Sequence, residues 1–185
     1  MIFRLFLRHA SKHGAHVIVD LNVRAHLWSS KKVMKEAVSK VIRHAALVKA
    51  SLTDLTALDI GNEAAAIRWV RAKAPEATVI VTRGAGKASA HGPHGEVSLS
   101  GHKAHCVDAT GAGDAFLAGV IAAVVAARAE PGAASWDDPA TWLAALEIGH
   151  SLGVKAVSKI GAVRGITGLA SVRSKLHVLT ISKRS

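Results

Sequence analysis

Cysteine, tyrosine, acidic residues and long apolar runs are scarce in this sequence of 185 residues, and each scarcity narrows its possible classes. The single cysteine, Cys106, cannot form an internal disulfide, which favours a reducing, cytoplasmic location. A secreted protein without disulfides remains open. The most apolar region, residues 115–127, is too short to span a bilayer without strain, so the sequence does not support a membrane role.

Acidic residues number 13 against 24 lysines and arginines, which gives a formal net charge of +11. Such an excess raises the hypothesis of nucleic-acid binding. The basic residues are scattered, however, and no aromatic RNA-binding signature or zinc-ligand spacing accompanies them. We therefore interpret the charge mainly as a solvated surface that could also favour an anionic substrate. A basic nucleic-acid-binding module is kept as an alternative that rests on charge alone.

The first 14 residues combine short apolar runs with Arg4 and Arg8, and the apolar part is too short for a signal-peptide core. Two interpretations remain open, a weak organelle-targeting helix and the end of an amphipathic core helix. The second is favoured.

Short apolar runs alternate with longer amphipathic segments along the chain. One segment places Val33, Ala37, Val41 and Ala45 on a single helical face, and Asn62 is suited to cap the helix that follows. Strands are predicted over residues 16–20, 46–51 and 77–84, a hairpin over 87–101, and helices over 31–45, 63–74, 112–128 and 139–159. This alternation predicts an α/β domain with a largely parallel sheet.

The stretch VDATGAGDAFLAGV, residues 107–120, places small residues where the last long apolar helix begins. Gly111, Ala112 and Gly113 leave room for a close approach, and free N–H groups with the helix dipole would favour a phosphate there. Asp114 would lie in the first turn as a weak base. From these residues alone, an ordinary helix start with a favourable acid is an equal alternative.

The longer string DATGAGDAFLAG resembles the C-terminal signature of the ribokinase-like (PfkB) carbohydrate kinases. This resemblance implies that Asp114 is the base that activates a sugar hydroxyl. It also implies that the backbone of Gly111, Ala112 and Gly113 forms the anion hole for the phosphoryl group transferred from ATP.

A second segment, VDLNVRAHLW, resembles the fructokinase and 2-keto-3-deoxygluconate kinase branch of this family. By that resemblance, Asp20, Asn22 and Arg24 line the cleft near the sugar and the phosphates. The alternative is a polar exit from a strand, packed under Trp28.

A third segment, VTRGAGKASA, resembles the family's strand and glycine-rich loop beside the nucleotide, matched at Thr82 and Gly84. It is not a Walker A loop, because Val81 stands where that motif needs its first glycine and Ala88 replaces its Ser or Thr.

The family's Asn-x-x-Glu region is represented here by Ser51 and Asp54, so no direct metal ligand is expected and Mg²⁺ would arrive as the ATP complex. Asp54 could equally sit in a helix's first turn. A potassium site is suggested by the resemblance, with counterparts at Asp108, Thr110, Ala156 and Gly161.

The resemblance implies a ribokinase-like three-layer α/β domain with a mostly parallel sheet over residues 1–165, followed by an unassigned basic tail at 166–185. It corresponds to the C-terminal half of a family kinase, without the N-terminal strands and the β lid. The expected function is an ATP-dependent sugar kinase. The alternative is a truncated, weakly active or inactive nucleotide-binding remnant that needs a complementary N-terminal half, and a homodimer is a further open possibility.

Overall fold

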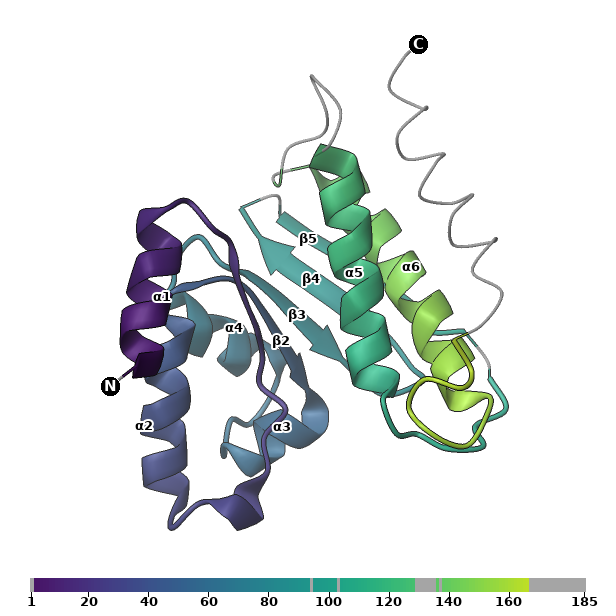
Figure 1. The fold of residues 1–185 in the computed structure, drawn as a ribbon, viewed down its shortest axis with the longest axis horizontal. Coiled ribbons are helices and arrows are strands. Elements are labelled where there is room, and N and C mark those ends of the chain that lie inside the picture. Colours follow the sequence, from purple (N-terminus) through teal and green to yellow (C-terminus); the bar gives the residue numbers. More distant parts are fainter. Residues whose placement is uncertain (1, 94, 103, 129–135, 137, 167–185) are drawn as a thin grey trace. The chain divides into compact units, whose positions relative to one another are not determined.

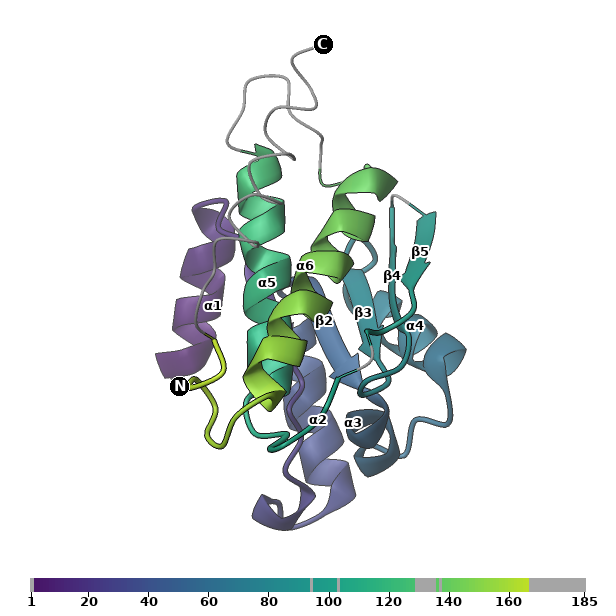
Figure 2. The same ribbon diagram turned by 90° about the vertical axis from the view of Figure 1, so that its right-hand side faces the viewer.

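The computed structural model describes residues 2–93, 95–102, 104–128, 136 and 138–166. The chain divides into two compact units, Met1–Arg83 with Ala90–Pro93, and Gly84–Ser89 with His94–Ser185. Each unit has its own helices, drawn in two views in Figures 1 and 2.

The first unit is an α/β structure in which strands and helices alternate. Its elements are α1 (Ile2–Lys12), β1 (Val17–Asp20), the short 3-10 helix η1 (Ala25–Leu27), α2 (Lys31–Ile42), β2 (Ala45–Ser51), α3 (Leu52–Ala57), α4 (Glu63–Arg71) and β3 (Thr78–Thr82). They are followed by β4 (Ala88–Gly92) and β5 (Gly95–Leu99), and then by α5 (Ala112–Arg128) and α6 (Pro139–Val157) of the second unit.

Side-chain caps explain where helices of the first unit begin. Oγ of Ser30 accepts a hydrogen bond from the N–H of Val33 (3.2 Å) at the start of α2. The amide oxygen of Asn62 accepts from the N–H of Ala65 (2.9 Å) at the start of α4. The predicted cap at Asn62 is therefore confirmed.

The strands form one sheet in the order β1-β2-β3-β4-β5, and β1, β2 and β3 run parallel. In the register of these pairs, Asp20 lies opposite Lys49, and Ser51 lies opposite Thr82. The last residues of the three strands therefore share one edge, which is where open α/β sheets commonly bind their ligands. The predicted α/β class with a mostly parallel sheet is confirmed.

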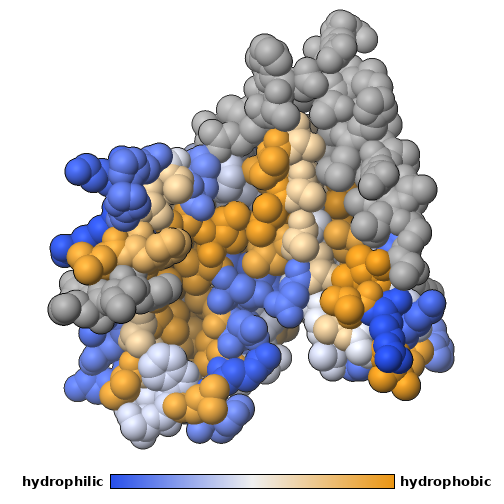
Figure 3. Space-filling view, in the orientation of Figure 1, coloured by the Kyte–Doolittle hydropathy of each residue, from blue (hydrophilic) through white to orange (hydrophobic). Residues whose placement is uncertain are grey.

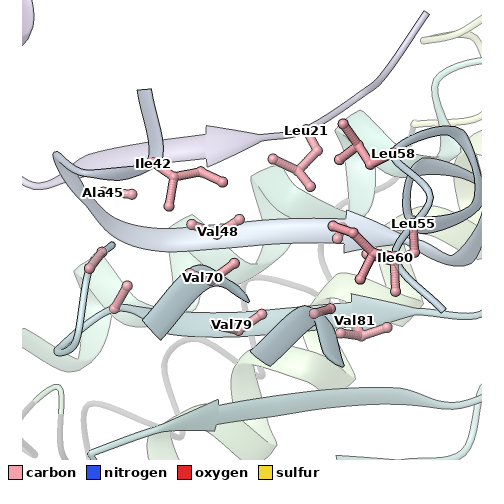
Figure 4. Close-up of a cluster of buried hydrophobic side chains, with 14 of the residues drawn as sticks. Leu21, Ile42, Ala45, Val48, Leu55, Leu58, Ile60, Val70, Val79 and Val81 are labelled. Atoms are coloured by element: carbon pink, nitrogen blue, oxygen red, sulfur yellow. The ribbon is translucent and has the colours of Figure 1, made fainter. Parts of the chain in front are cut away.

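A buried apolar cluster fixes these strands against their helices (Figure 4). Val48 of β2 and Val79 of β3 are fully buried at its centre. Ile42 of α2, Leu55 of α3 and Val70 of α4 complete it, each at most 2% exposed. Burial of such side chains stabilises the fold by about 1.5–3 kcal/mol each, and it holds the helix ends beside the strand ends.

The face of α2 that is buried lies one residue away from the predicted apolar face of Val33, Ala37, Val41 and Ala45. Met34 and Ile42 are buried, whereas Val33 is 46% exposed. The helix also ends before Ala45, which is the first residue of β2.

The N-terminal segment forms the helix α1, in which Leu7 is buried while Leu5 and Phe6 are exposed. The predicted helix is therefore present in this part of the chain. Among the residues that the structure describes, no helix is both long and apolar enough to cross a membrane.

In the second unit, α5 and α6 pack side by side in both views (Figures 1 and 2). Their backbones approach closely at Gly119, where an added Cβ would lie 2.9 Å from the Cα of Gly149. Trp142 and Leu146 of α6 are fully buried in this unit. The predicted tail, residues 166–185, lies outside the described residues from 167 onward.

Candidate active site

The predicted anion site lies at the N-terminus of α5 in the second unit. Gly111 has a φ of +78°, which favours glycine, and its carbonyl accepts from the N–H of Ala115 (2.9 Å) as α5 begins. The N–H of Ala112 is bonded within the preceding turn. Helix geometry leaves the N–H groups of Gly113 and Asp114 without an intrahelical acceptor. Two donors and the positive end of the helix dipole therefore suit a phosphate.

Asp114 stands in the first turn of α5, as predicted, and its side chain is exposed. A carboxylate there is within the same turn as the two N–H donors. The position suits a group that takes a proton from a hydroxyl attacking a bound phosphoryl group.

Gly111 is required for a second reason, its close approach to the segment after α6. A Cβ at residue 111 would lie 2.7 Å from the Cβ of Ala162. Any larger residue at position 111 would therefore push residues 110–113, called the anion loop below, away from residues 158–166.

Hydrogen bonds of Asp108 also hold the anion loop in place. One carboxylate oxygen accepts from the N–H of Thr110 (2.9 Å), and the other accepts from the N–H of Gly161 (2.8 Å). The N–H of Val107 also donates to the carbonyl of Val157 (2.8 Å), at the end of α6. Hydrogen bonds from Thr110 and Gly161 hold the pKa of Asp108 at about 2, so this carboxyl is ionised at neutral pH.

The residues predicted for a potassium site are partly brought together. Asp108, Thr110 and Gly161 are joined by hydrogen bonds, whereas Ala156 is fully buried within α6. A carboxylate among backbone groups of a turn is a donor set that suits a hard cation. Both oxygens of the Asp108 carboxylate accept from N–H groups, so a monovalent cation at this place stays a prediction.

In the first unit, Asp20 is bonded to a lysine that sequence reasoning missed. Nζ of Lys49 lies 3.2 and 3.0 Å from the two carboxylate oxygens, and the two side chains are 16% and 7% exposed, Asp20 first. Burial raises the pKa of Asp20, and Lys49 opposes this rise. The signal in the sequence was a lysine inside an otherwise apolar strand. The ion pair of Asp20 with Lys49 thus fixes the start of residues 20–24, called the cleft segment below.

Asn22 and Arg24 follow Asp20 and are both exposed. Asn22 has a φ of +35°, an uncommon conformation for a residue other than glycine. Trp28, the proposed cover in the alternative interpretation, is itself 38% exposed. Asn22 and Arg24 are therefore accessible after the carboxyl end of β1, and their contact with a ligand stays a prediction.

Asp54 lies in the first turn of α3, where it forms a capping box with Ser51. Asp54 is 4% exposed, and its carboxylate also accepts a hydrogen bond from the N–H of Val23 (2.7 Å). Both oxygens are bonded to protein donors, and the expectation of no direct metal ligand at this position stays a prediction.

The predicted nucleotide residues stand where β3 ends. Thr82 is half-buried, and its hydroxyl lies 3.5 Å from the carbonyl of Ala50. Gly84, in the second unit, has a φ of +58° and is exposed. A positive φ explains why glycine is required at 84.

A second polar cluster in the first unit had no signal in the sequence. Glu63, at the start of α4, accepts from Arg83 and lies 2.7 Å from Nε2 of His91. These residues are 20 and 28 positions away from Glu63, so only the fold reveals the cluster. Within the described ranges, no group of three or more His, Cys, Asp or Glu residues could hold a metal ion.

The family model for "pfkB family carbohydrate kinase" matches residues 3–167. Aminoimidazole riboside kinase of Salmonella typhimurium is 26% identical over 159 residues, which cover 86% of this chain and 48% of that protein. Fructokinase of Escherichia coli is 33% identical over 120 residues, covering 62% and 37%. A solved double mutant of Vibrio cholerae fructokinase, bound to fructose, ADP and potassium, has a TM-score of 0.76 at 27% identity, covering 92% and 53%.

The chain spans about half the length of the curated relatives it matches. The family match extends over most of its residues, and the solved fructokinase shares its fold. Because the family model matches residues 3–167, the chain belongs to the pfkB family of carbohydrate kinases.

Proposed function

We propose that this chain carries the phosphoryl-transfer machinery of an ATP-dependent sugar kinase, with Asp114 as the base and Gly111, Ala112 and Gly113 as the anion hole. One observation carries the proposal: an exposed carboxylate shares the first turn of α5 with two N–H groups that have no intrahelical acceptor. Such a turn stabilises negative charge on the phosphoryl group while Asp114 receives the proton of the attacking hydroxyl.

The remaining roles follow from the residues at the carboxyl ends of β1 and β3. Thr82 and Gly84 contact the nucleotide, and Mg²⁺ enters bound to the ATP phosphates. Asn22 and Arg24 face the sugar and phosphates, while the ion pair of Asp20 with Lys49 fixes the start of their segment.

Two cations supply charge neutralisation when they are bound. Mg²⁺ shields the phosphate oxygens of ATP. Potassium would be held beside Asp108, Thr110 and Gly161 and would stabilise the loop that precedes Asp114. The related fructokinase structure contains a potassium ion, which supports the use of this cation in the family.

ADP release by the purified chain tests the proposal. Fructose, 2-keto-3-deoxygluconate and aminoimidazole riboside are offered as acceptors with MgATP, and a reaction without sugar measures hydrolysis by water. The kinase hypothesis expects ADP release that depends on one of these sugars. Equal rates with and without sugar would contradict it.

A second candidate is a nucleotide-binding half that needs a complementary polypeptide. Its support is the coverage of the relatives and the position of β1, the terminal strand of the sheet, whose four residues are all only partly buried. Apolar residues are also exposed on α1, at Leu5 and Phe6, and Figure 3 shows apolar surface among hydrophilic residues.

This candidate expects a rise in melting temperature on addition of MgADP without sugar-dependent ADP release. The rise measures binding to the folded state alone. Light scattering of the same sample separates a monomer from a homodimer.

A further inference from the structure

Asp54 makes a hydrogen bond outside its own helix that the helix cap does not require. Oδ2 accepts from the N–H (2.8 Å) and the hydroxyl (2.7 Å) of Ser51, and the Ser51 hydroxyl accepts in return from the N–H of Asp54 (3.1 Å). These bonds complete the capping box of α3. Oδ1 is not needed for the cap and accepts instead from the N–H of Val23, 31 residues earlier (2.7 Å).

The cleft segment is thus held at two points. At its start, Asp20 is bonded to Lys49, and the N–H of Leu21 donates to the carbonyl of Lys49 (3.0 Å). Three residues after Asp20, the N–H of Val23 is held by Asp54. Asn22 lies between the two points and has a positive φ. A conformation of this kind persists only where surrounding contacts determine it.

Val23 itself turns toward the protein and packs against the buried cluster of the first unit. Its neighbours Asn22 and Arg24 are exposed. The bond to Asp54 is charge-assisted and shielded from water, because Asp54 is 4% exposed. Loss of that bond would free the backbone between the two exposed side chains without removing either of them.

We propose that Asp54 is a positioning residue, which holds the turn of Asn22, Val23 and Arg24 in the conformation that presents Asn22 and Arg24 to the sugar and phosphates. That Asp54 fixes the turn depends only on its hydrogen bond to Val23. That the turn presents Asn22 and Arg24 to a ligand rests on the proposed function. In this proposal Asp54 acts on the ligand through the backbone, because both oxygens of its carboxylate accept from protein donors.

The test compares two variants that both weaken the cap of α3. Asp54→Ala removes the cap and the bond to Val23. Ser51→Ala removes the Ser51 hydroxyl but leaves Oδ1 of Asp54 on Val23. Glu36→Gln removes one negative charge from an exposed position of α2 and controls for net charge.

Amide hydrogen exchange of the full chain without ligand is the first readout. In Asp54→Ala, the exchange rate of the Val23 amide should be roughly 10- to 100-fold higher than in wild type, because a charge-assisted hydrogen bond is lost. In Ser51→Ala and Glu36→Gln, the exchange rate of this amide should stay close to the wild-type rate, once the change in each variant's global stability is taken into account. A Val23 amide that exchanges equally in Asp54→Ala and Ser51→Ala would overturn the proposal.

The second readout is a double-mutant cycle between Asp54→Ala and Arg24→Ala, measured as the KM for fructose and for MgATP. If Asp54 acts through the turn, each single variant raises a KM and the double variant is hardly worse than Arg24→Ala. Fully additive effects would overturn the positioning role. Absence of wild-type turnover would count against the proposed function, while the Val23 amide would still decide the role of Asp54.

Discussion

At the scale of single residues, Asp108 determines how the anion loop is held. Its carboxylate joins Thr110, the first residue of the loop, to Gly161, which follows α6. Gly111 then lies against Ala162, so the loop is fixed at two neighbouring points. The Asp108 carboxylate must be ionised to accept both N–H groups well, and its lowered pKa agrees with this role.

This pKa gives a pH-dependent contribution to stability. Because the pKa falls from 3.8 to about 2 on folding, the stabilisation by Asp108 is complete above about pH 4 and is lost as the pH falls through 2. Thermal melting of wild type and Asp108→Ala should therefore differ at pH 5, and the difference should shrink as the pH falls from about 4 to 2. A difference that stays constant over this range would show that Asp108 contributes nothing through its charge.

At the scale of elements, the contact of α5 with α6 sets the position of the anion site in its unit. An added Cβ at Gly119 would lie 2.9 Å from both the Cα of Gly149 and the carbonyl oxygen of Ile148. These atoms belong to backbone, which cannot rotate away as a side chain does. The two helices can keep their separation only if residue 119 has no side chain.

Gly119→Ala should therefore destabilise the protein by about 1–3 kcal/mol, the usual cost of overpacking a core. Gly153→Ala is the matched control in α6, because its Cβ would lie 3.5 Å from the nearest atom, the carbonyl oxygen of Ala112. The control should be neutral or more stable by up to about 1 kcal/mol, since alanine favours helix. Urea unfolding measures both. Equal effects of the two substitutions would argue against close helix packing.

Element type could be predicted from the sequence because strands rich in β-branched residues and a capped helix carry local signals. The buried face of α2 could not, because Val33 and Met34 both fit a helical period and only packing chooses Met34. The pair of Asp20 and Lys49 also required the parallel register, since the two residues are 29 positions apart. The turn before Asp114 could be predicted because its backbone conformation favours glycine at position 111.

At the scale of the whole molecule, the chain contains two groups of candidate residues, one in each unit. The first unit holds Asn22, Arg24 and Thr82, and the second holds Gly84 and the anion site with Asp114. In the proposed function, the formal net charge of +11 would favour the approach of the anionic ATP phosphates. Steeply salt-dependent DNA binding would instead support a nucleic-acid role.

The most direct test of the account is ADP release with the preferred sugar, measured for wild type and Asp114→Asn, with the affinity for MgADP measured in parallel. We expect the turnover of Asp114→Asn to fall by about 10²–10⁴-fold, the usual contribution of a general base, while MgADP binds as it does to wild type. Turnover that survives the substitution at the wild-type rate would contradict the role of Asp114 and, with it, the central claim.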